Sequence, residues 1–133
     1  MKNYLFDTSA LLTLRDNEAG ADQVAEILHQ AQQHKALCYG CFMSQMEVLY
    51  CVWKDENEEE ARLAYQQCLL LPMEWVHESQ ALLEKAAEIK SNHPLSLADG
   101  WIAAAVLLQR AALVHKDPEF EALSCRQIVL PYK

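Results

Sequence analysis

The chain has 133 residues, 52% of them hydrophobic, with only 3 Gly and 4 Pro. This composition fits a single domain, residues 1–133, with a sizeable core, and it excludes a disordered or repetitive chain. The net charge of −8 and the pI of about 5.0 argue against a basic face that would bind nucleic acid regardless of sequence. They leave open a nuclease whose phosphate contacts run through bound cations.

From the sequence we expect neither a targeting segment nor a membrane-spanning segment. Asp7 interrupts the apolar N-terminal residues too early for a signal peptide, and the most apolar run, 101–108, is too short to cross a bilayer. We therefore expect a cytoplasmic protein. The five cysteines are odd in number, and Cys38 and Cys41 form a C-x-x-C pair that is open to a zinc or a redox interpretation. Because no second ligand pair lies at short spacing, we expect buried free thiols.

The first half of the chain predicts alternating strands and helices. Tyr4 to Phe6 are strand-forming and apolar, and this run stops at the carboxylate of Asp7. The predicted elements are, in order, a strand at 4–6, helices at 10–15 and 21–34, a strand at 37–39, and a helix that starts at residue 44. We expect the acidic run 55–60 to be an exposed turn that places negative charge at the start of the next helix.

The second half continues the alternation. Its predicted elements are a helix at 61–70, a strand at 74–76, helices at 80–90 and 96–110, a strand at 113–115, a helical turn at 119–123 and a strand at 127–130. Pro72 and the Asn92-His93-Pro94 segment separate the helices. Strands that alternate with helices predict an α/β fold with a central, mainly parallel sheet flanked by helices.

Four acidic residues are predicted to meet at one edge of this sheet. Asp7 and Asp117 come at the carboxyl ends of strands, where open α/β folds bind ligands. Glu47 and Asp99 each lie three residues after a predicted helix start, which points to the same edge. The alternative is purely local: Asp7 is an N-cap, and the segments from Ser44 to Glu47 and from Ser96 to Asp99 are capping boxes or close to them.

Carboxylates that pack together repel one another and raise one another's pKa unless a cation neutralises them. Three of the four acids have no Lys or Arg beside them in the sequence. The predicted ligands are all hard oxygen atoms, which favours Mg²⁺ or Mn²⁺ over zinc. The pattern therefore predicts a divalent cation at this edge.

Several segments resemble the PIN-domain nucleases, in particular the small single-domain toxins of the VapC type. The likeness extends over nearly the full length of the chain, and four segments carry it, in order: Leu5 to Ser9, Ser44 to Glu47, Leu95 to Ala104, and Leu113 to Phe120. The resemblance implies a parallel sheet between helices, metal-dependent cleavage of RNA, a homodimer and a cognate antitoxin. It implies a site made of the metal-binding acids and of two lining hydroxyl groups: Asp7, Glu47, Asp99, Asp117, Thr8 and Ser9.

The chain departs from the family pattern at two positions near these acids. His115 stands where Ser or Thr is common, and Gly100 stands where Ala is usual. His115 is open to two interpretations, a proton shuttle or a strand-end histidine whose ring atoms are satisfied by hydrogen bonds. The positive side chains of Lys116, Arg15 and Lys54 are candidate phosphate contacts, with solvated surface as the alternative.

The leading hypothesis is a metal-dependent endoribonuclease in which Asp7 and Asp99 bind the metal directly. Glu47 is then a ligand or a base that positions water, and Asp117 completes the cluster. A second hypothesis is a PIN-like module that binds a protein partner, with weak or no catalysis. A phosphatase with Asp7 as nucleophile is disfavoured because that class has a second Asp two residues later, where this chain has Ser9.

Overall fold

The computed structural model describes residues 1–132, which contain a five-stranded, entirely parallel sheet of order β3-β2-β1-β4-β5. The strands are β1 (Lys2–Phe6), β2 (Ala36–Cys41), β3 (Glu74–Val76), β4 (Ala112–His115) and β5 (Gln127–Val129). From β1 the chain adds β2 and β3 on one side, and then returns to add β4 and β5 on the other. The strand order therefore reverses beside β1, the place where α/β sheets bind ligands.

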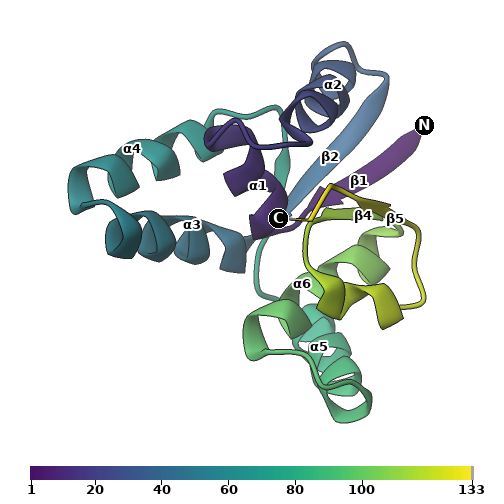
Figure 1. Ribbon diagram of the computed structural model, residues 1–133. Helices are drawn as coiled ribbons and strands as arrows, with labels where there is room; N and C mark the ends of the chain where they lie inside the picture. The colour runs from purple at the N-terminus through teal and green to yellow at the C-terminus, as the bar shows by residue number, and fades with distance from the viewer. Residues whose placement is uncertain (133) are drawn as a thin grey trace.

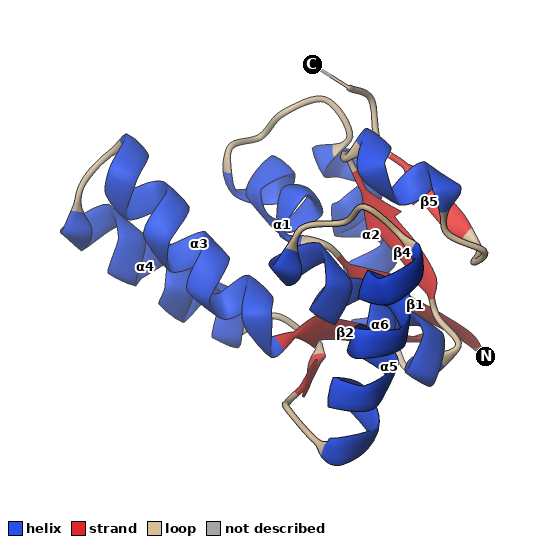
Figure 2. Ribbon diagram, turned by 90° about the horizontal axis from the view of Figure 1, so that it is seen from below, coloured by secondary structure: helices blue, strands red, loops and turns tan. Residues whose placement is uncertain are grey.

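Helices cover both faces of the sheet (Figure 1). They are α1 (Thr8–Arg15), α2 (Ala21–Gln32), α3 (Phe42–Asp55), α4 (Glu58–Leu69), α5 (Gln80–Asn92), α6 (Leu97–Gln109) and the 3₁₀ helix η1 (Pro118–Ala122). Tyr4 and Phe6 face the core under α1 to α4, whereas Leu5 between them faces the core under α5 and α6. The α3–α4 hairpin extends away from the sheet (Figure 2).

The predicted fold class is confirmed, with element bounds that shift by a few residues; the starts of α4 and α3 are two examples. Helix α4 begins at Glu58 and not at residue 61, because the Asn57 side chain accepts a hydrogen bond from the backbone N–H of Glu60 at 2.9 Å. The acidic residues therefore form the first helical turn itself. Helix α3 begins at Phe42, two residues before the predicted start at Ser44. Within residues 1–132, no helix combines the length and the apolar character that a bilayer crossing requires.

The two cysteines of the C-x-x-C pair belong to different cores. Cys38 packs under α1 to α4, and Cys41 packs in the core under α5 and α6. Burial raises the pKa of the Cys38 thiol to about 12 and that of the Cys41 thiol to about 11, so both are inert at neutral pH. The expectation of buried free thiols is confirmed for these two and for Cys68, while Cys51 and Cys125 are half-buried free thiols.

Gly40 in β2 leaves room for the Trp75 ring of the neighbouring strand. A Cβ atom at Gly40 would lie 2.6 Å from the Trp75 ring and 2.8 Å from the Met73 methyl group. We expect Gly40→Ala to lower the free energy of unfolding by about 1–3 kcal/mol, as overpacking of a core does, measured by urea denaturation. Gly100→Ala is the control, because its Cβ would meet only the flexible Lys90 stem. Equal losses in both variants would contradict this account.

Candidate functional site

Asp7 sits where β1 ends and α1 begins, and it is only 3% exposed. Its carboxylate accepts hydrogen bonds from the backbone N–H and the hydroxyl of Ser9, so the predicted N-cap is present. Burial, and to a lesser degree the charges of Glu47 and Asp117, raise the pKa of Asp7 to about 6. Asp7 is therefore both a helix cap and a member of a group of facing acids.

Glu47 lies on α3 and is held by a hydroxyl group from α1. The Thr8 hydroxyl donates to Glu47 Oε1 at 2.6 Å, and Ser44 Oγ lies 2.9 Å from Thr8 Oγ1. Ser44 is a residue of α3 itself and is fully buried. The N-cap of α3 is Cys41, whose side chain makes no capping hydrogen bond. The capping-box interpretation of Ser44 and Glu47 is therefore wrong, because the helix starts earlier and both side chains face Thr8.

Asp99 lies in the first turn of α6, where Ser96 Oγ accepts a hydrogen bond from the Asp99 backbone N–H at 3.1 Å. The Ser96 cap is confirmed. Burial raises the pKa of the Asp99 carboxyl group to about 8; the charges of Asp7 and Asp117, a hydrogen bond with Asp117, and the charge of Glu47 add to this. With a pKa of about 8, the Asp99 carboxyl group favours its protonated form at neutral pH when the site holds no cation.

Asp117 and Glu119 come together in the turn after β4. Asp117 caps η1, and its Oδ1 accepts a hydrogen bond from the Glu119 backbone N–H at 3.0 Å. Among the described residues, carboxylate oxygens of Asp99, Asp117 and Glu119 lie within 4.8 Å of one another, a spacing that one cation can bridge. Asp7 and Glu47 are outside this close group but near enough to raise the pKa of Asp99. We refer to these five acids as the acid cluster.

Glu119 was not among the acids predicted from the sequence. It occupies the first turn of η1, so a tight 3₁₀ turn places it beside Asp117. The Asp-Pro-Glu sequence carried a signal for this, because Pro favours the first position of a helical turn. A helical turn was predicted to begin at Glu119, without a role in the site.

Backbone and ring contacts tie the segments of the acid cluster together. Ser9 Oγ accepts a hydrogen bond from the Lys116 backbone N–H at 2.9 Å, which joins the start of α1 to the turn after β4. Phe42 and Trp101 pack edge to face with ring centroids 5.3 Å apart, which joins the start of α3 to α6. The members of the acid cluster come from four segments of the chain, and these contacts hold the segments against one another.

The positive side chains predicted as phosphate contacts pair with acids outside the acid cluster. Lys116 Nζ lies 3.3 Å from Glu18, and Arg15 lies 2.6 Å from Glu56. Lys54 is exposed. In residues 1–132, the ion pairs of Arg62 and Lys85 also involve acids on their own helices. The acid cluster is therefore not neutralised by an ion pair from any of these five side chains.

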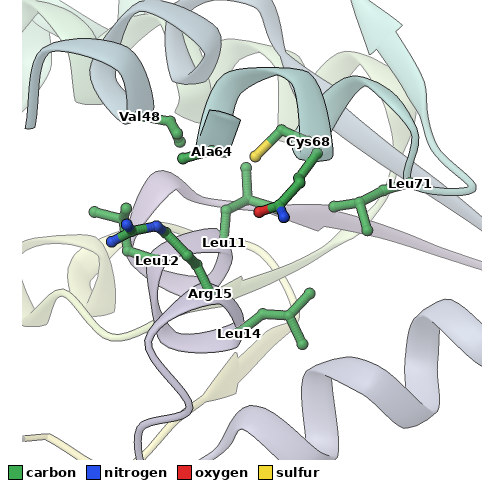
Figure 3. Close-up of a pocket in the computed structure, with 9 residues that line it drawn as sticks. Leu11, Leu12, Leu14, Arg15, Val48, Ala64, Cys68 and Leu71 are labelled. Carbon is green, nitrogen blue, oxygen red and sulfur yellow. The ribbon is translucent and has the colours of Figure 1, made fainter. Parts of the chain in front are cut away.

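A separate hollow lies between α1, α3 and α4, and no member of the acid cluster lines it. It has a volume of about 280 Å³, and its lining is mainly apolar. Figure 3 shows Leu11 of α1 and Cys68 of α4 pointing toward each other across it, with Arg15 at one side. Such a hollow suits an apolar side chain of a bound partner better than a phosphate.

A buried group of carboxylates at the switch point of a parallel sheet places the chain in a recognisable class of α/β proteins. In a comparison with models of protein families, the model of the PIN domain matches residues 4–124 of this chain. The chain belongs to the PIN domain family. A search of curated proteins finds no match.

Solved structures of VapC-type toxins share the fold over nearly the full length. VapBC2 from Rickettsia felis, bound to promoter DNA, matches with TM-score 0.78 and 15% identity, covering 97% of this chain and 99% of that one. A toxin–antitoxin complex from Klebsiella pneumoniae matches with TM-score 0.72 and 21% identity (98% and 99% covered). VapC20 from Mycobacterium tuberculosis, described as a sarcin–ricin loop cleaving toxin, matches with TM-score 0.74 and 16% identity (96% and 99%). The chain therefore has the fold of these proteins.

Proposed function

We propose that this PIN-domain chain is a metal-dependent endoribonuclease and the toxin of a toxin–antitoxin pair. The observation that carries the proposal is the acid cluster. Its buried members repel one another, and within residues 1–132 they form no ion pair with a Lys or Arg side chain. The proposed metal ligands are Asp7 and Asp99, with Glu47 and Asp117 completing the site. Glu119 joins them because its carboxylate meets those of Asp99 and Asp117.

The donor set fits a hard divalent cation. All candidate ligand atoms are carboxylate oxygens, and Thr8 and Ser9 add hydroxyl groups that orient two of the carboxylates. Oxygen-only sites with several carboxylates suit Mg²⁺ or Mn²⁺. A cation bound there supplies Lewis-acid stabilisation of the charge that develops on a scissile phosphodiester.

The protein's own side chains provide orientation and proton transfer. Thr8 fixes one oxygen of Glu47 by its hydrogen bond at 2.6 Å, which leaves the second oxygen to orient an attacking water and accept its proton. Ser9 fixes one oxygen of Asp7, Oδ2, and makes no bond to the other oxygen, Oδ1. These bonds hold the reacting groups in place before RNA arrives, which lowers the cost of ordering them.

The test is to incubate the purified chain with mixed cellular RNA in Mn²⁺, in Mg²⁺ and in excess EDTA. We expect discrete fragments with either cation and none with EDTA, resolved by gel electrophoresis and end mapping. A fragment pattern that persists unchanged in EDTA would contradict metal dependence. RNA that stays intact with both cations, across ribosomal, transfer and messenger RNA, would contradict the nuclease assignment.

We also propose an antitoxin as the protein partner and a homodimer as the assembly. Support comes from the fold neighbours, several of which are structures of toxin–antitoxin complexes. A cytoplasmic location stays a prediction.

A second candidate function is a PIN-like module that binds a protein with little catalysis. The hollow beside Leu11 and Cys68, together with the net charge of −8, favours a partner segment that is both apolar and basic. The two functions differ in one measurement. A binding module predicts that millimolar Mn²⁺ leaves the melting temperature unchanged, because no cation binds the folded state.

A further inference from the structure

His115 occupies the end of β4, two residues before Asp117, and its side chain is fully buried. Its Nδ1 accepts a hydrogen bond from the Asp117 backbone N–H at 3.0 Å. Its Nε2 lies 2.8 Å from Oε1 of Gln127 on β5. The ring packs edge to face on Phe120 of η1, with centroids 5.3 Å apart. Both ring nitrogens therefore have partners, as expected for a satisfied strand-end histidine, and neither is free to shuttle protons.

Gln127 determines which ring nitrogen carries the proton. Its amide nitrogen donates to the carbonyl oxygens of Phe120 and Leu123, at 2.9 Å and 3.2 Å. The amide oxygen must then face His115, so Nε2 carries the hydrogen and donates it. This leaves Nδ1 as the acceptor that the Asp117 N–H requires. Gln127 thus holds the ring on one side and the carbonyl groups around η1 on the other.

The hydrogen bond from the Asp117 N–H to the His115 ring has the pattern of a common side-chain turn motif, but with an unusual acceptor side chain. Asn, Asp, Ser and Thr accept a hydrogen bond from the backbone N–H two residues later, which fixes the turn. Here an imidazole accepts it. The Asp117 carboxylate in turn accepts a hydrogen bond from the Glu119 N–H at 3.0 Å. A continuous chain of hydrogen bonds therefore runs from Gln127 through His115 to Asp117 and Glu119.

We propose that His115 and Gln127 are positioning residues that hold the turn at residues 116–120 so that the Asp117 and Glu119 carboxylates meet Asp99. This inference rests on the proposed function, because it assigns a role within the same cation site. Neither residue belongs to the acid cluster, and both ring nitrogens of His115 already have protein partners. Outer residues that orient metal ligands typically change metal affinity by about 10- to 100-fold when they are replaced.

The experiment compares two replacements of His115. His115→Phe keeps a buried ring of similar shape but removes both hydrogen bonds. His115→Asn shrinks the side chain but keeps an acceptor that can reach the N–H two residues on. Gln127→Met removes the partner of Nε2 while keeping side-chain length. Val24→Ala, in the core under α1 to α4 and outside this network, controls for a general loss of stability.

Two readouts are measured on each folded protein: Mn²⁺ affinity by calorimetry, and hydrogen exchange of the Asp117 amide by NMR in the metal-free state. We expect His115→Phe and Gln127→Met to weaken Mn²⁺ binding about 10-fold or more. We expect the Asp117 amide to exchange faster in His115→Phe than in wild type. We expect the Mn²⁺ affinity of His115→Asn and of Val24→Ala to stay within about threefold of the wild-type value. The proposal is overturned if His115→Phe binds Mn²⁺ as tightly as wild type, or if Val24→Ala weakens it equally.

The exchange readout separates this inference from the proposed function. If the wild-type protein binds no Mn²⁺, the proposed function fails, and the Asp117 amide alone decides the role of His115. Faster exchange in His115→Phe than in His115→Asn and Val24→Ala then supports positioning of the turn. Equal exchange in all three variants overturns it.

Discussion

Asp99→Asn is expected to reduce the rate of metal-dependent RNA cleavage on the order of a thousandfold, which corresponds to about 4 kcal/mol of transition-state stabilisation. The same substitution is expected to raise the melting temperature of the protein in EDTA. The two effects have one cause. Asp99 is 9% exposed, and burial raises its pKa to about 8, with a further contribution from repulsion by the charges of Asp7 and Asp117. A neutral amide of the same shape removes this repulsion but binds a hard cation far less well.

The control is Asp22→Asn, the same chemical change at an exposed position in the first turn of α2. It should leave cleavage unchanged and cost only a few tenths of a kcal/mol of helix-dipole stabilisation. Cleavage at the wild-type rate by Asp99→Asn would remove Asp99 from the site. A lower melting temperature of Asp99→Asn in EDTA would contradict the electrostatic explanation.

Much of the fold was predictable because its signals are local. The run from Tyr4 to Phe6 is apolar and ends at a carboxylate, and Ser96 precedes a long apolar helix, so one strand end and one helix start could be placed. Alternation of strands and helices then determined that Asp7 and Asp99 share an edge. The charge of Asp7 contributes to the raised pKa of Asp99, which agrees with that placement.

The remaining features depend on contacts that no local pattern encodes. Ser44 resembled a helix cap, but its hydroxyl contacts Thr8, which is 36 residues away. Glu119 joins the acid cluster only because η1 is a tight turn packed through Phe120. The partner of His115 Nε2 is Gln127 on the adjacent strand, so the role of His115 depends on strand pairing between β4 and β5. Such partners follow from the tertiary fold.

Mn²⁺ is expected to raise the melting temperature of the wild-type protein at pH 8 and to do so much less at pH 6. Folding raises the pKa of Asp99 from 3.8 to about 8. Between these values, the folded protein keeps a proton that the unfolded chain has lost, so the free energy of unfolding of the metal-free protein falls as pH rises. The raised pKa of Asp7, about 6, acts in the same direction.

A cation must displace that proton, so its binding strengthens as pH rises toward 8. At a Mn²⁺ concentration 100 times the dissociation constant at pH 8, the stabilisation is about 2.7 kcal/mol, or roughly 10 °C for a chain of this size. At pH 6 the competing proton weakens binding by up to about 100-fold, which leaves a shift of only one or two degrees.

Scanning calorimetry at both pH values measures these shifts, with Asp99→Asn as the comparison. This variant lacks the carboxyl group that holds the proton, so its metal-free stability should vary less with pH and its response to Mn²⁺ should be small at both values. A wild-type shift that is as large at pH 6 as at pH 8 would show that the cation binds without displacing a proton. The acid cluster would then not be its site, because the raised pKa values of Asp7 and Asp99 require that exchange.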